Sequence, residues 1–257
     1  MTPHALPPVD PAVVSAAVEI VREAGELTLK HFRSTDLEVI AKGDGTPVTV
    51  ADQGAERLIR ERLGEQFPDD SVLGEEEADH HGTSGRRWVI DPIDGTKAFT
   101  HGVPLYTNLL ALDDEHGPAV GVINVPGLSE TVWAGRGLGC FCNGEQVQVS
   151  TTSDLSGGWV TTSGFDPWTV DLFTRLKGAG VHLRTWGDGY GYVLVATGRV
   201  DAMIDPAAAL WDVAPMPVIL SEAGGRFTST DGDPRPDQGS GLGTNGAIHD
   251  ALLDLLS

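Results

Sequence analysis

The chain has 257 residues, of which 40% are hydrophobic and 21% are charged, and its formal net charge is -20. This composition excludes a disordered chain, and the acidity excludes a nucleic-acid-binding protein because a polyanion would be repelled. The chain has no apolar run near the roughly 20 residues of a membrane span and no signal-peptide pattern, so we expect a cytoplasmic protein without membrane contact.

The N-terminal part of the chain alternates helices with short strands. Asp10-Pro11 begins a helix that extends to about residue 33, because a capping residue followed by proline is typical of a first helical turn. Four segments follow in order: a strand at 37–41, a polar loop at 42–47, a helix at 50–67 and a strand at 71–74. The segment 78–87 has no apolar pattern, and a mobile lid is one hypothesis for it.

The stretch Trp88-Val-Ile-Asp-Pro-Ile-Asp-Gly-Thr96 is where we place the chemistry. The apolar residues at its start predict the end of a buried strand. Pro92 and Gly95 terminate this strand, so Asp91 and Asp94 fall in the turn. Asp-Gly-Thr then starts a helix or a tight turn whose backbone N–H groups suit a phosphate. Carboxylates this close repel each other unless a cation lies between them, and Mg²⁺ prefers such hard oxygen ligands. Taken alone, the motif is also compatible with an ordinary turn.

After Thr96 the hydrophobic pattern changes to the period of strands. Five strands are expected, at 106–112, 119–125, 130–134, 139–141 and 146–149. Asn143-Gly144, between the last two, is a hairpin signal, so the sequence predicts an antiparallel sheet.

From about residue 153 strands and helices alternate again, which predicts a layered α/β half. Strands are expected at 159–162, 182–185, 200–205 and 225–228. Helices are expected at 170–176, 189–198, 211–223 and 246–256. We therefore divide the chain into an N-terminal α+β half, residues 1–152, with the metal site, and a C-terminal α/β half, residues 153–257, with the substrate specificity.

Three further carboxylates belong to patterns that suit metal chemistry. Glu75 ends a predicted strand, and Asp52 and Asp212 each lie in the first turn of a predicted helix. Each also has a plain structural interpretation, since acidic residues are favourable at helix N-termini and Glu75 belongs to an acidic run. Together they form the set that a phosphate hydrolase with two or three metals requires.

Gly74-Glu75-Glu76, Asp91-Pro-Ile-Asp-Gly-Thr96 and Trp211-Asp212, in this order, resemble the motifs of the inositol monophosphatase superfamily. Lys42-x-Asp44 and Pro47-Val-Thr49-x-x-Asp52 are similar to its N-terminal motif. The resemblance covers nearly the whole chain. It implies an αβαβα sandwich, two to three Mg²⁺ ions in each active site, and a homodimer.

The resemblance also implies a role for each matched metal-site residue. Glu75, Asp91 and the backbone carbonyl of Ile93 resemble the ligands of a first metal. Asp91, Asp94 and Asp212 resemble the ligands of a second, and Glu75 would help to hold a third.

Phosphate and water contacts follow from the same resemblance. Asp94, Gly95 and Thr96 resemble the phosphate-binding group, and Thr96 with Asp52 resembles the pair that orients the attacking water. Water activated in this way attacks phosphorus in line, with no covalent phosphoenzyme. His101, five residues beyond Thr96, is interpreted as loop surface or as the rim of the substrate site.

The segment that distinguishes substrates is Trp186-Gly-Asp-Gly-Tyr-Gly-Tyr192, which is similar to the histidinol-phosphate phosphatase branch of the superfamily. Histidinol phosphate carries an ammonium group and an imidazole, and an extra carboxylate suits a cation better than a ring of hydroxyls. The resemblance places Asp188, Gly189 and Asp205 at the substrate. A helix N-cap is the structural alternative for Asp188, and Tyr190 and Tyr192 are expected in the core.

Several functions remain open from the sequence. The first is a histidinol-phosphate phosphatase of histidine biosynthesis, and the alternative is an inositol-1-monophosphatase or a broad sugar-phosphate phosphatase with the same metals. A nucleotide 3′-phosphatase would need basic groups for a second phosphate, and the segment 185–198 contains no Lys or Arg. A non-enzymatic metal-binding module would need a damaged site, whereas every expected ligand is present.

Overall fold

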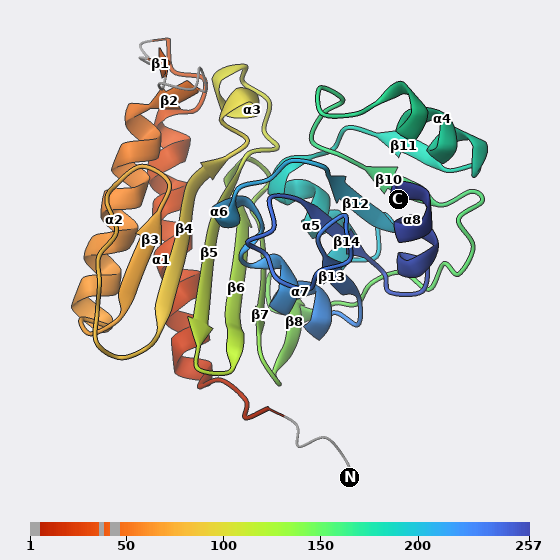
Figure 1. Cartoon of the computed structure of the whole chain (residues 1–257). Helices are drawn as coiled ribbons and strands as arrows, with labels where there is room; N and C mark the ends of the chain where they lie inside the picture. Colours follow the sequence, from red (N-terminus) through yellow and green to blue (C-terminus); the bar gives the residue numbers. More distant parts are fainter. Residues whose placement is uncertain (1–5, 36–38, 42–46) are drawn as a thin grey trace.

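The computed structural model describes residues 6–35, 39–41 and 47–257, which form five layers (Figure 1). Helices cover the outer face of a seven-stranded sheet, further helices separate it from a five-stranded sheet, and others cover that second sheet. The predicted αβαβα fold class is confirmed. Within the described part of the chain, no helix is both long enough and apolar enough to span a bilayer.

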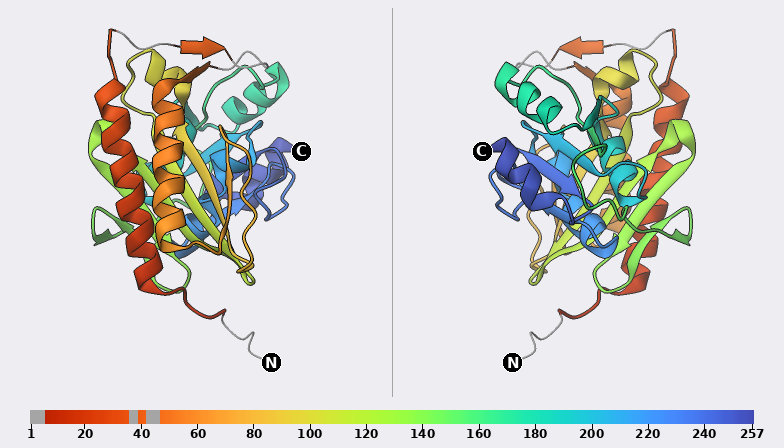
Figure 2. Two further views of the ribbon diagram at one scale, coloured as in Figure 1. Left: turned by 90° about the vertical axis from the view of Figure 1, so that its left-hand side faces the viewer. Right: turned by 90° about the vertical axis from the view of Figure 1, so that its right-hand side faces the viewer.

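The first layer consists of α1 (Pro11–His31) and α2 (Val50–Gln66), which lie side by side on one face of the seven-stranded sheet (Figure 2). Asp10 caps α1 by accepting a hydrogen bond from the N–H of Ala12 at 2.9 Å, as the sequence predicts. The apolar stripes of both helices pack against the sheet and bury Trp88 completely. Each Å² of apolar surface that is buried here stabilises the fold by about 25 cal/mol, which holds this layer in place.

Two short strands, β1 (Val39–Ala41) and β2 (Pro47–Thr49), pair antiparallel beside the start of α2. The sequence predicts the first strand but assigns Pro47 to a loop. The predicted Lys42-x-Asp44 motif lies outside the described residues.

The seven-stranded sheet has the order β3-β4-β5-β6-β7-β8-β9. Its strands are β3 (Ser71–Gly74), β4 (Arg87–Asp94), β5 (Thr107–Asp114), β6 (Gly117–Val125), β7 (Glu130–Gly135), β8 (Gly139–Cys142) and β9 (Glu145–Gln146). Every neighbouring pair is antiparallel except β3 and β4. The predicted hairpin is confirmed, with Asn143 at φ +49° and Gly144 at φ +92°, the left-handed conformation that a tight hairpin turn needs.

Strand β4 corrects the prediction that the strand ends at Ile90. It continues to Asp94 through a β-bulge, where the register with β5 shifts between Asp91 and Asp94. A bulge tolerates Pro92, which has no N–H for the ladder, and the side-chain amide of Asn108 donates to the Pro92 carbonyl at 2.6 Å. Gly95 follows at φ +79° and the short helix α3 (Thr96–Thr100) begins, as predicted.

The segment 78–86 is not free of regular contacts. His80 forms an antiparallel bridge with Val72, and its N–H donates to the Val72 carbonyl at 2.9 Å. The Arg86 guanidinium lies 2.9 Å from the carboxylate of Asp70. These contacts fix the segment to the outer edge of the sheet.

The five-stranded sheet has the order β11-β10-β12-β14-β13. Its strands are β10 (Trp159–Thr161), β11 (His182–Arg184), β12 (Ala202–Asp205), β13 (Arg226–Thr228) and β14 (Gly241–Thr244). Helices α5 (Asp188–Ala196), α6 (Leu210–Val213) and α7 (Met216–Glu222) lie between the two sheets, and α4 (Val170–Gly178) and α8 (His249–Leu256) lie outside (Figure 1).

One prediction in this half is wrong, and one strand was missed. The helix predicted at 211–223 is two helices, because Pro215 interrupts the pattern between α6 and α7. Strand β14 was not predicted, since its Gly-Leu-Gly-Thr sequence resembles a turn. Its glycines are required by packing: a Cβ on Gly241 would lie 2.3 Å from the hydroxyl of Tyr192, and one on Gly243 would lie 2.7 Å from Leu220.

Candidate active site

A cavity of about 660 Å³ opens where the end of β4, the starts of α5 and α6, and the end of β12 come together. Carboxylates dominate its lining: Glu75, Asp91, Asp94, Asp166, Asp188, Asp205 and Asp212. Among the described residues of the lining, Lys97 supplies the positive charge. The cavity is therefore strongly acidic and suited to cations.

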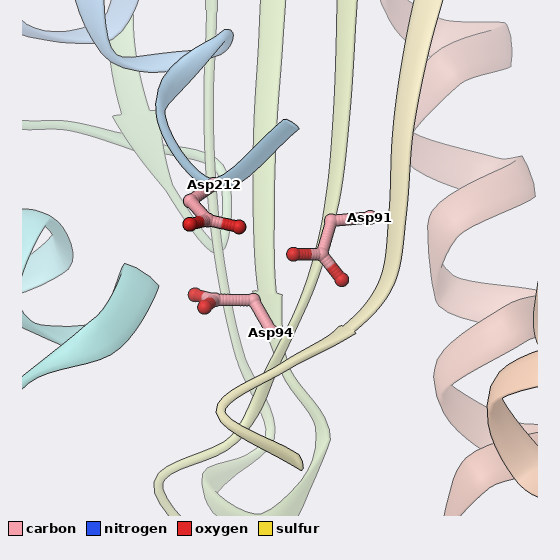
Figure 3. A group of neighbouring side chains, drawn as sticks. All are labelled: Asp91, Asp94 and Asp212. Atoms are coloured by element: carbon pink, nitrogen blue, oxygen red, sulfur yellow. The ribbon is translucent and has the colours of Figure 1, made fainter. Parts of the chain in front are cut away.

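Three of these carboxylates form a compact cluster. Asp91 and Asp94 come from the bulged end of β4 and Asp212 from α6, and their carboxylates lie close together (Figure 3). Each offers an oxygen atom within 4.8 Å of the others. The bulge makes this arrangement, because it turns both aspartates of one strand into the same cavity.

Hydrogen bonds orient two members of the cluster. Asp94 Oδ2 accepts from the Thr107 hydroxyl at 2.9 Å and from the backbone N–H of Gly189. Asp212 Oδ2 accepts from the N–H of Ala209 at 2.8 Å at the start of α6. One oxygen of each carboxylate is thus fixed by the protein, which holds the other in a defined direction.

Burial and mutual repulsion make this cluster resist ionisation. The pKa of Asp91 is well above its usual range because of burial, followed by the charges of Glu75 and Asp94. Burial, followed by repulsion from Asp188, likewise raises the pKa of Asp94, and burial raises the pKa of Asp212 to about 6. A cation placed among these oxygens would remove the repulsion.

The donor set fits a hard divalent metal. Asp91 Oδ1 is buried and has no hydrogen-bond partner among the described residues. Burying such an oxygen is unfavourable unless a ligand satisfies it. Three carboxylates with one such oxygen are the environment that Mg²⁺ or Ca²⁺ occupies in proteins.

Glu75 and Ile93, the other predicted metal ligands, line the same cavity. Glu75 lies outside the three-carboxylate cluster, but its charge contributes to the raised pKa values of Asp91 and Asp212. The carbonyl of Ile93 accepts a hydrogen bond from the Thr96 hydroxyl at 3.0 Å.

Asp52 and Thr96, the predicted water-orienting pair, are brought together from separate elements. Thr96 Oγ1 lies 3.4 Å from Asp52 Oδ1. Asp52 is completely buried in the first turn of α2, where its Oδ2 accepts hydrogen bonds from the N–H and the hydroxyl of Thr49 at 2.7 and 2.5 Å. Burial raises the pKa of Asp52.

Opposite the cluster, Asp188 and Asp205 line the cavity from α5 and β12. The hydroxyl of Ser163 connects them, because it donates to Asp205 Oδ1 at 2.6 Å and accepts from the Asp188 N–H at 2.9 Å. Asp188 has a left-handed backbone, with φ +53°, and its side chain lies over Gly95. This places a pair of carboxylates beside the start of α3.

Both carboxylates of this pair are perturbed. Burial raises the pKa of Asp205 to about 7. The Ser163 hydrogen bond opposes this shift, and repulsion from Asp188 adds to it. Burial also raises the pKa of Asp188, while Lys97 and the Ser163 hydrogen bond lower it. A cationic ligand would favour the charged form of both groups.

Of the other residues singled out in the sequence, some have a different role from the predicted one and some lie where they were expected. Gly189 is buried in α5 and donates its N–H to Asp94 Oδ2. Asp188 is not the N-cap of α5, since Gly187 occupies that position. Tyr192 is buried in the core, as expected, and His101 is exposed and bonded to the Lys97 carbonyl at 2.8 Å.

Sequence reasoning missed three residues that contribute to the site. Thr107 and Ser163 are single hydroxyl residues with no motif around them, and their partners are distant in sequence. Lys97 directly follows the Asp-Gly-Thr motif, so its position beside the predicted phosphate site was the available signal.

The chain matches the model of the inositol monophosphatase family over residues 10–257. It is 45% identical over 213 residues to a histidinol-phosphatase of Chlorobaculum parvum, covering 81% of this chain and 82% of that protein. It is 38% identical over 250 residues to a histidinol-phosphatase of Mycobacterium tuberculosis, covering 94% and 96%.

Among solved structures, the Thermotoga maritima IMPase superposes with a TM-score of 0.87 at 29% identity, covering 95% of this chain and 96% of that chain. The match therefore extends over nearly the whole chain.

Proposed function

The chain belongs to the inositol monophosphatase family, and on that premise we propose that it hydrolyses histidinol phosphate to histidinol and phosphate with the help of Mg²⁺. The observation that carries the choice of substrate is the pair Asp188 and Asp205, which Ser163 joins on one wall of an acidic cavity. Two relatives similar over most of the chain are named for this activity.

Enzymes of this family are metal-dependent, and Asp91, Asp94 and Asp212 form the candidate metal site. We assign two to three Mg²⁺ ions to this cluster together with Glu75 and the Ile93 carbonyl. When bound, the metal supplies a nucleophilic water near neutral pH and stabilises the charge on the leaving oxygen. The chain's own part is to fix the carboxylates and to bind the phosphate at Gly95 and Thr96, which line the cavity beside the cluster.

Thr96 and Asp52 orient the attacking water. The Thr96 hydroxyl has two acceptors behind it, Ile93 O at 3.0 Å and Asp52 Oδ1 at 3.4 Å, so its proton points away from the cavity. A lone pair of the hydroxyl is then free to accept a hydrogen bond from the water, which directs the water's oxygen toward phosphorus. The raised pKa of buried Asp52 makes it the stronger proton acceptor of the two behind Thr96.

Asp188 and Asp205 bind the leaving group. The ammonium of histidinol makes charge-assisted hydrogen bonds to carboxylates, which are stronger than neutral ones. The Ser163 hydroxyl keeps Asp205 Oδ1 in place, so the carboxylate has a defined orientation on the cavity wall. Inositol offers only hydroxyl groups, which would not compensate the negative charges of these two carboxylates.

The test is phosphate release with Mg²⁺, comparing kcat/KM for histidinol phosphate and inositol-1-phosphate. We expect a preference for histidinol phosphate of about 100-fold or more, which corresponds to roughly 2.7 kcal/mol of transition-state discrimination. Equal rates, or a preference for inositol-1-phosphate, would overturn the substrate assignment and favour the alternative of an inositol or broad sugar-phosphate phosphatase.

We also propose, from the family resemblance, that the protein is a cytoplasmic homodimer. Light scattering of the purified protein tests the oligomer, because a dimer scatters with twice the mass of one chain. A mass equal to one chain would overturn this proposal without affecting the proposed chemistry.

A further inference from the structure

A completely buried carboxylate lies near the site but outside the cavity. Glu56 is in α2, one helical turn after Asp52, and its side chain has no exposed surface. Residues four apart in a helix share a face, so Asp52 and Glu56 both point from α2 toward the candidate active site. A buried carboxylate costs several kcal/mol unless it is fully paired.

The partners of Glu56 all belong to one small region. Its Oε2 accepts from the N–H of Glu76 at 2.8 Å, and its Oε1 accepts from the N–H of Glu77 at 3.1 Å. The guanidinium of Arg60, one turn further along α2, donates to Oε1 at 2.8 Å. Both oxygens are therefore used, and two of the three bonds hold the backbone that follows Glu75.

Arg60 strengthens the same connection. Its Nη2 donates to the Glu77 carbonyl at 3.1 Å. The backbone of Glu77 is therefore hydrogen-bonded to side chains of α2 at both its N–H and its C=O. The Glu77 carboxylate also pairs with Arg57 at 3.0 Å. The segment after β3 is thus fixed to α2 by backbone bonds as well as by a surface ion pair.

The last residue of β3 allows this arrangement. A Cβ on Gly74 would lie 2.1 Å from Glu56 Oε1 and 2.8 Å from Arg60 Nη2. A side chain at this position would displace the Glu56 carboxylate, so the glycine is required by the contact and not by its backbone conformation.

We propose that Glu56 is the positioning residue for the predicted metal ligand Glu75. Glu75 lies between Gly74, which packs against Glu56, and Glu76, whose N–H Glu56 binds. With both neighbours fixed, the backbone directs Glu75 into the cavity that it lines. Helix α2 thereby supports two parts of the site, Thr96 through Asp52 and Glu75 through Glu56.

The inference rests on the proposed metal-dependent function and predicts an effect on metal affinity. An amide cannot replace this carboxylate, because both of its oxygens accept hydrogen bonds. In either orientation of the amide, its NH₂ group would face a backbone N–H, and in one orientation it would also face the Arg60 guanidinium. The loss of residues that orient a metal ligand typically costs roughly 10- to 100-fold in metal affinity.

The test is Glu56→Gln, with Mg²⁺ binding measured by isothermal titration calorimetry in the absence of substrate. We expect the Mg²⁺ dissociation constant to rise about tenfold, and the Mg²⁺ concentration for half-maximal phosphatase activity to rise with it. At saturating Mg²⁺, kcat stays within a few-fold of the unaltered protein. Glu65→Gln, the same change at an exposed position of α2, is the matched control and leaves both Mg²⁺ constants unchanged.

Two further variants separate positioning from general stability. Gly74→Ala removes no carboxylate but pushes that of Glu56 aside, and it produces the same loss of Mg²⁺ affinity. In a Glu75→Gln background, Glu56→Gln causes no additional loss, because its effect acts through Glu75.

A lower melting temperature for Glu56→Gln with an unchanged Mg²⁺ dissociation constant would overturn the inference and leave Glu56 a structural residue. Additive losses in the double variant would also overturn it. If Glu56→Gln does not fold, Gly74→Ala decides by the same measurement. Failure of the unaltered protein to bind Mg²⁺ would instead refute the proposed metal site.

Discussion

The two ends of the cavity are built in different ways. At the metal end, backbone N–H groups take part in orienting two carboxylates: Ala209 orients Asp212, and Gly189 orients Asp94 together with the Thr107 hydroxyl. At the substrate end, one hydroxyl, that of Ser163, holds both Asp205 and Asp188.

The difference predicts how each end responds to substitution. Backbone donors persist whatever the side chains are, so the fold itself sets much of the geometry of the metal end. At the substrate end one side chain, Ser163, links Asp205 with Asp188, so one substitution can change which leaving group is accepted. Asp94 connects the ends, because it belongs to the cluster and accepts from the first turn of α5.

The largest expected effect is at that connection. Asp94→Asn keeps the shape of the side chain but removes a negative charge from the three-carboxylate cluster. We expect kcat/KM to fall on the order of 10⁴-fold, about 5 kcal/mol in transition-state stabilisation, because metal binding and the start of α5 are both affected. Steady-state phosphate release measures this.

Asp113→Asn is the control for that variant, since Asp113 pairs with Arg87 at the far end of β4 and lies outside the cavity lining. It should retain full activity. Unchanged turnover in a folded Asp94→Asn protein would remove the metal-assisted mechanism.

The centre of the metal end could be predicted from the sequence because two of its carboxylates, Asp91 and Asp94, belong to one contiguous motif. Asp91 and Asp94 are separated by two residues, and the Gly95-Thr96 pair that follows them predicts the turn. The missed detail was the bulge in β4, because proline was interpreted as a strand terminator. Whether a proline ends a strand depends on the partner strand, here the Asn108 amide of β5, which the local sequence does not show.

The substrate end and the second sheet were harder to predict because their contacts are distant in sequence. Strand β14 is made of residues that resemble a turn, and it is a strand only because β12 and β13 pair with it and Tyr192 fills the space above its glycines. The role of Ser163 is equally invisible in the local sequence, because its partner Asp205 lies 42 positions further along the chain. Tertiary packing, and not local propensity, determines both features.

A smaller effect, confined to the substrate end, is expected from Ser163→Ala. The change removes a hydrogen bond to a carboxylate, worth about 1.5–3 kcal/mol, so kcat/KM for histidinol phosphate should fall roughly 10- to 100-fold. Turnover of p-nitrophenyl phosphate, whose leaving group carries no cation, should change by less than about threefold. Comparing the two substrates separates binding of the leaving group from chemistry at phosphorus.

Ser15→Ala, which removes an exposed hydroxyl on α1, serves as the matched control. An equal loss on both substrates for Ser163→Ala would mean that Ser163 supports the whole site, and the contrast between the two ends would be lost.

The smallest expected effect concerns the sheet that carries Asp205. His249 is buried at the start of α8, with Nε2 3.0 Å from the Thr228 hydroxyl and Nδ1 2.9 Å from the Thr244 hydroxyl. Burial, followed by the charge of Arg226, lowers its pKa from 6.5 to about 4. Thr244 pairs with Ala202 of β12, so the histidine supports the strand that ends at Asp205.

The sign of the pH dependence follows from that lowered pKa. Between pH 6.5 and 4 the unfolded chain binds a proton at His249 that the folded protein does not, so stability falls as the pH falls. The contribution lost between pH 7 and 5 is about 1–2 kcal/mol. Urea unfolding at both pH values measures it, and His249→Asn, which cannot take up that proton, should show a smaller loss over the same interval. Equal losses in the two proteins would show that His249 does not contribute, and would assign the acid sensitivity of the molecule to its carboxylates instead.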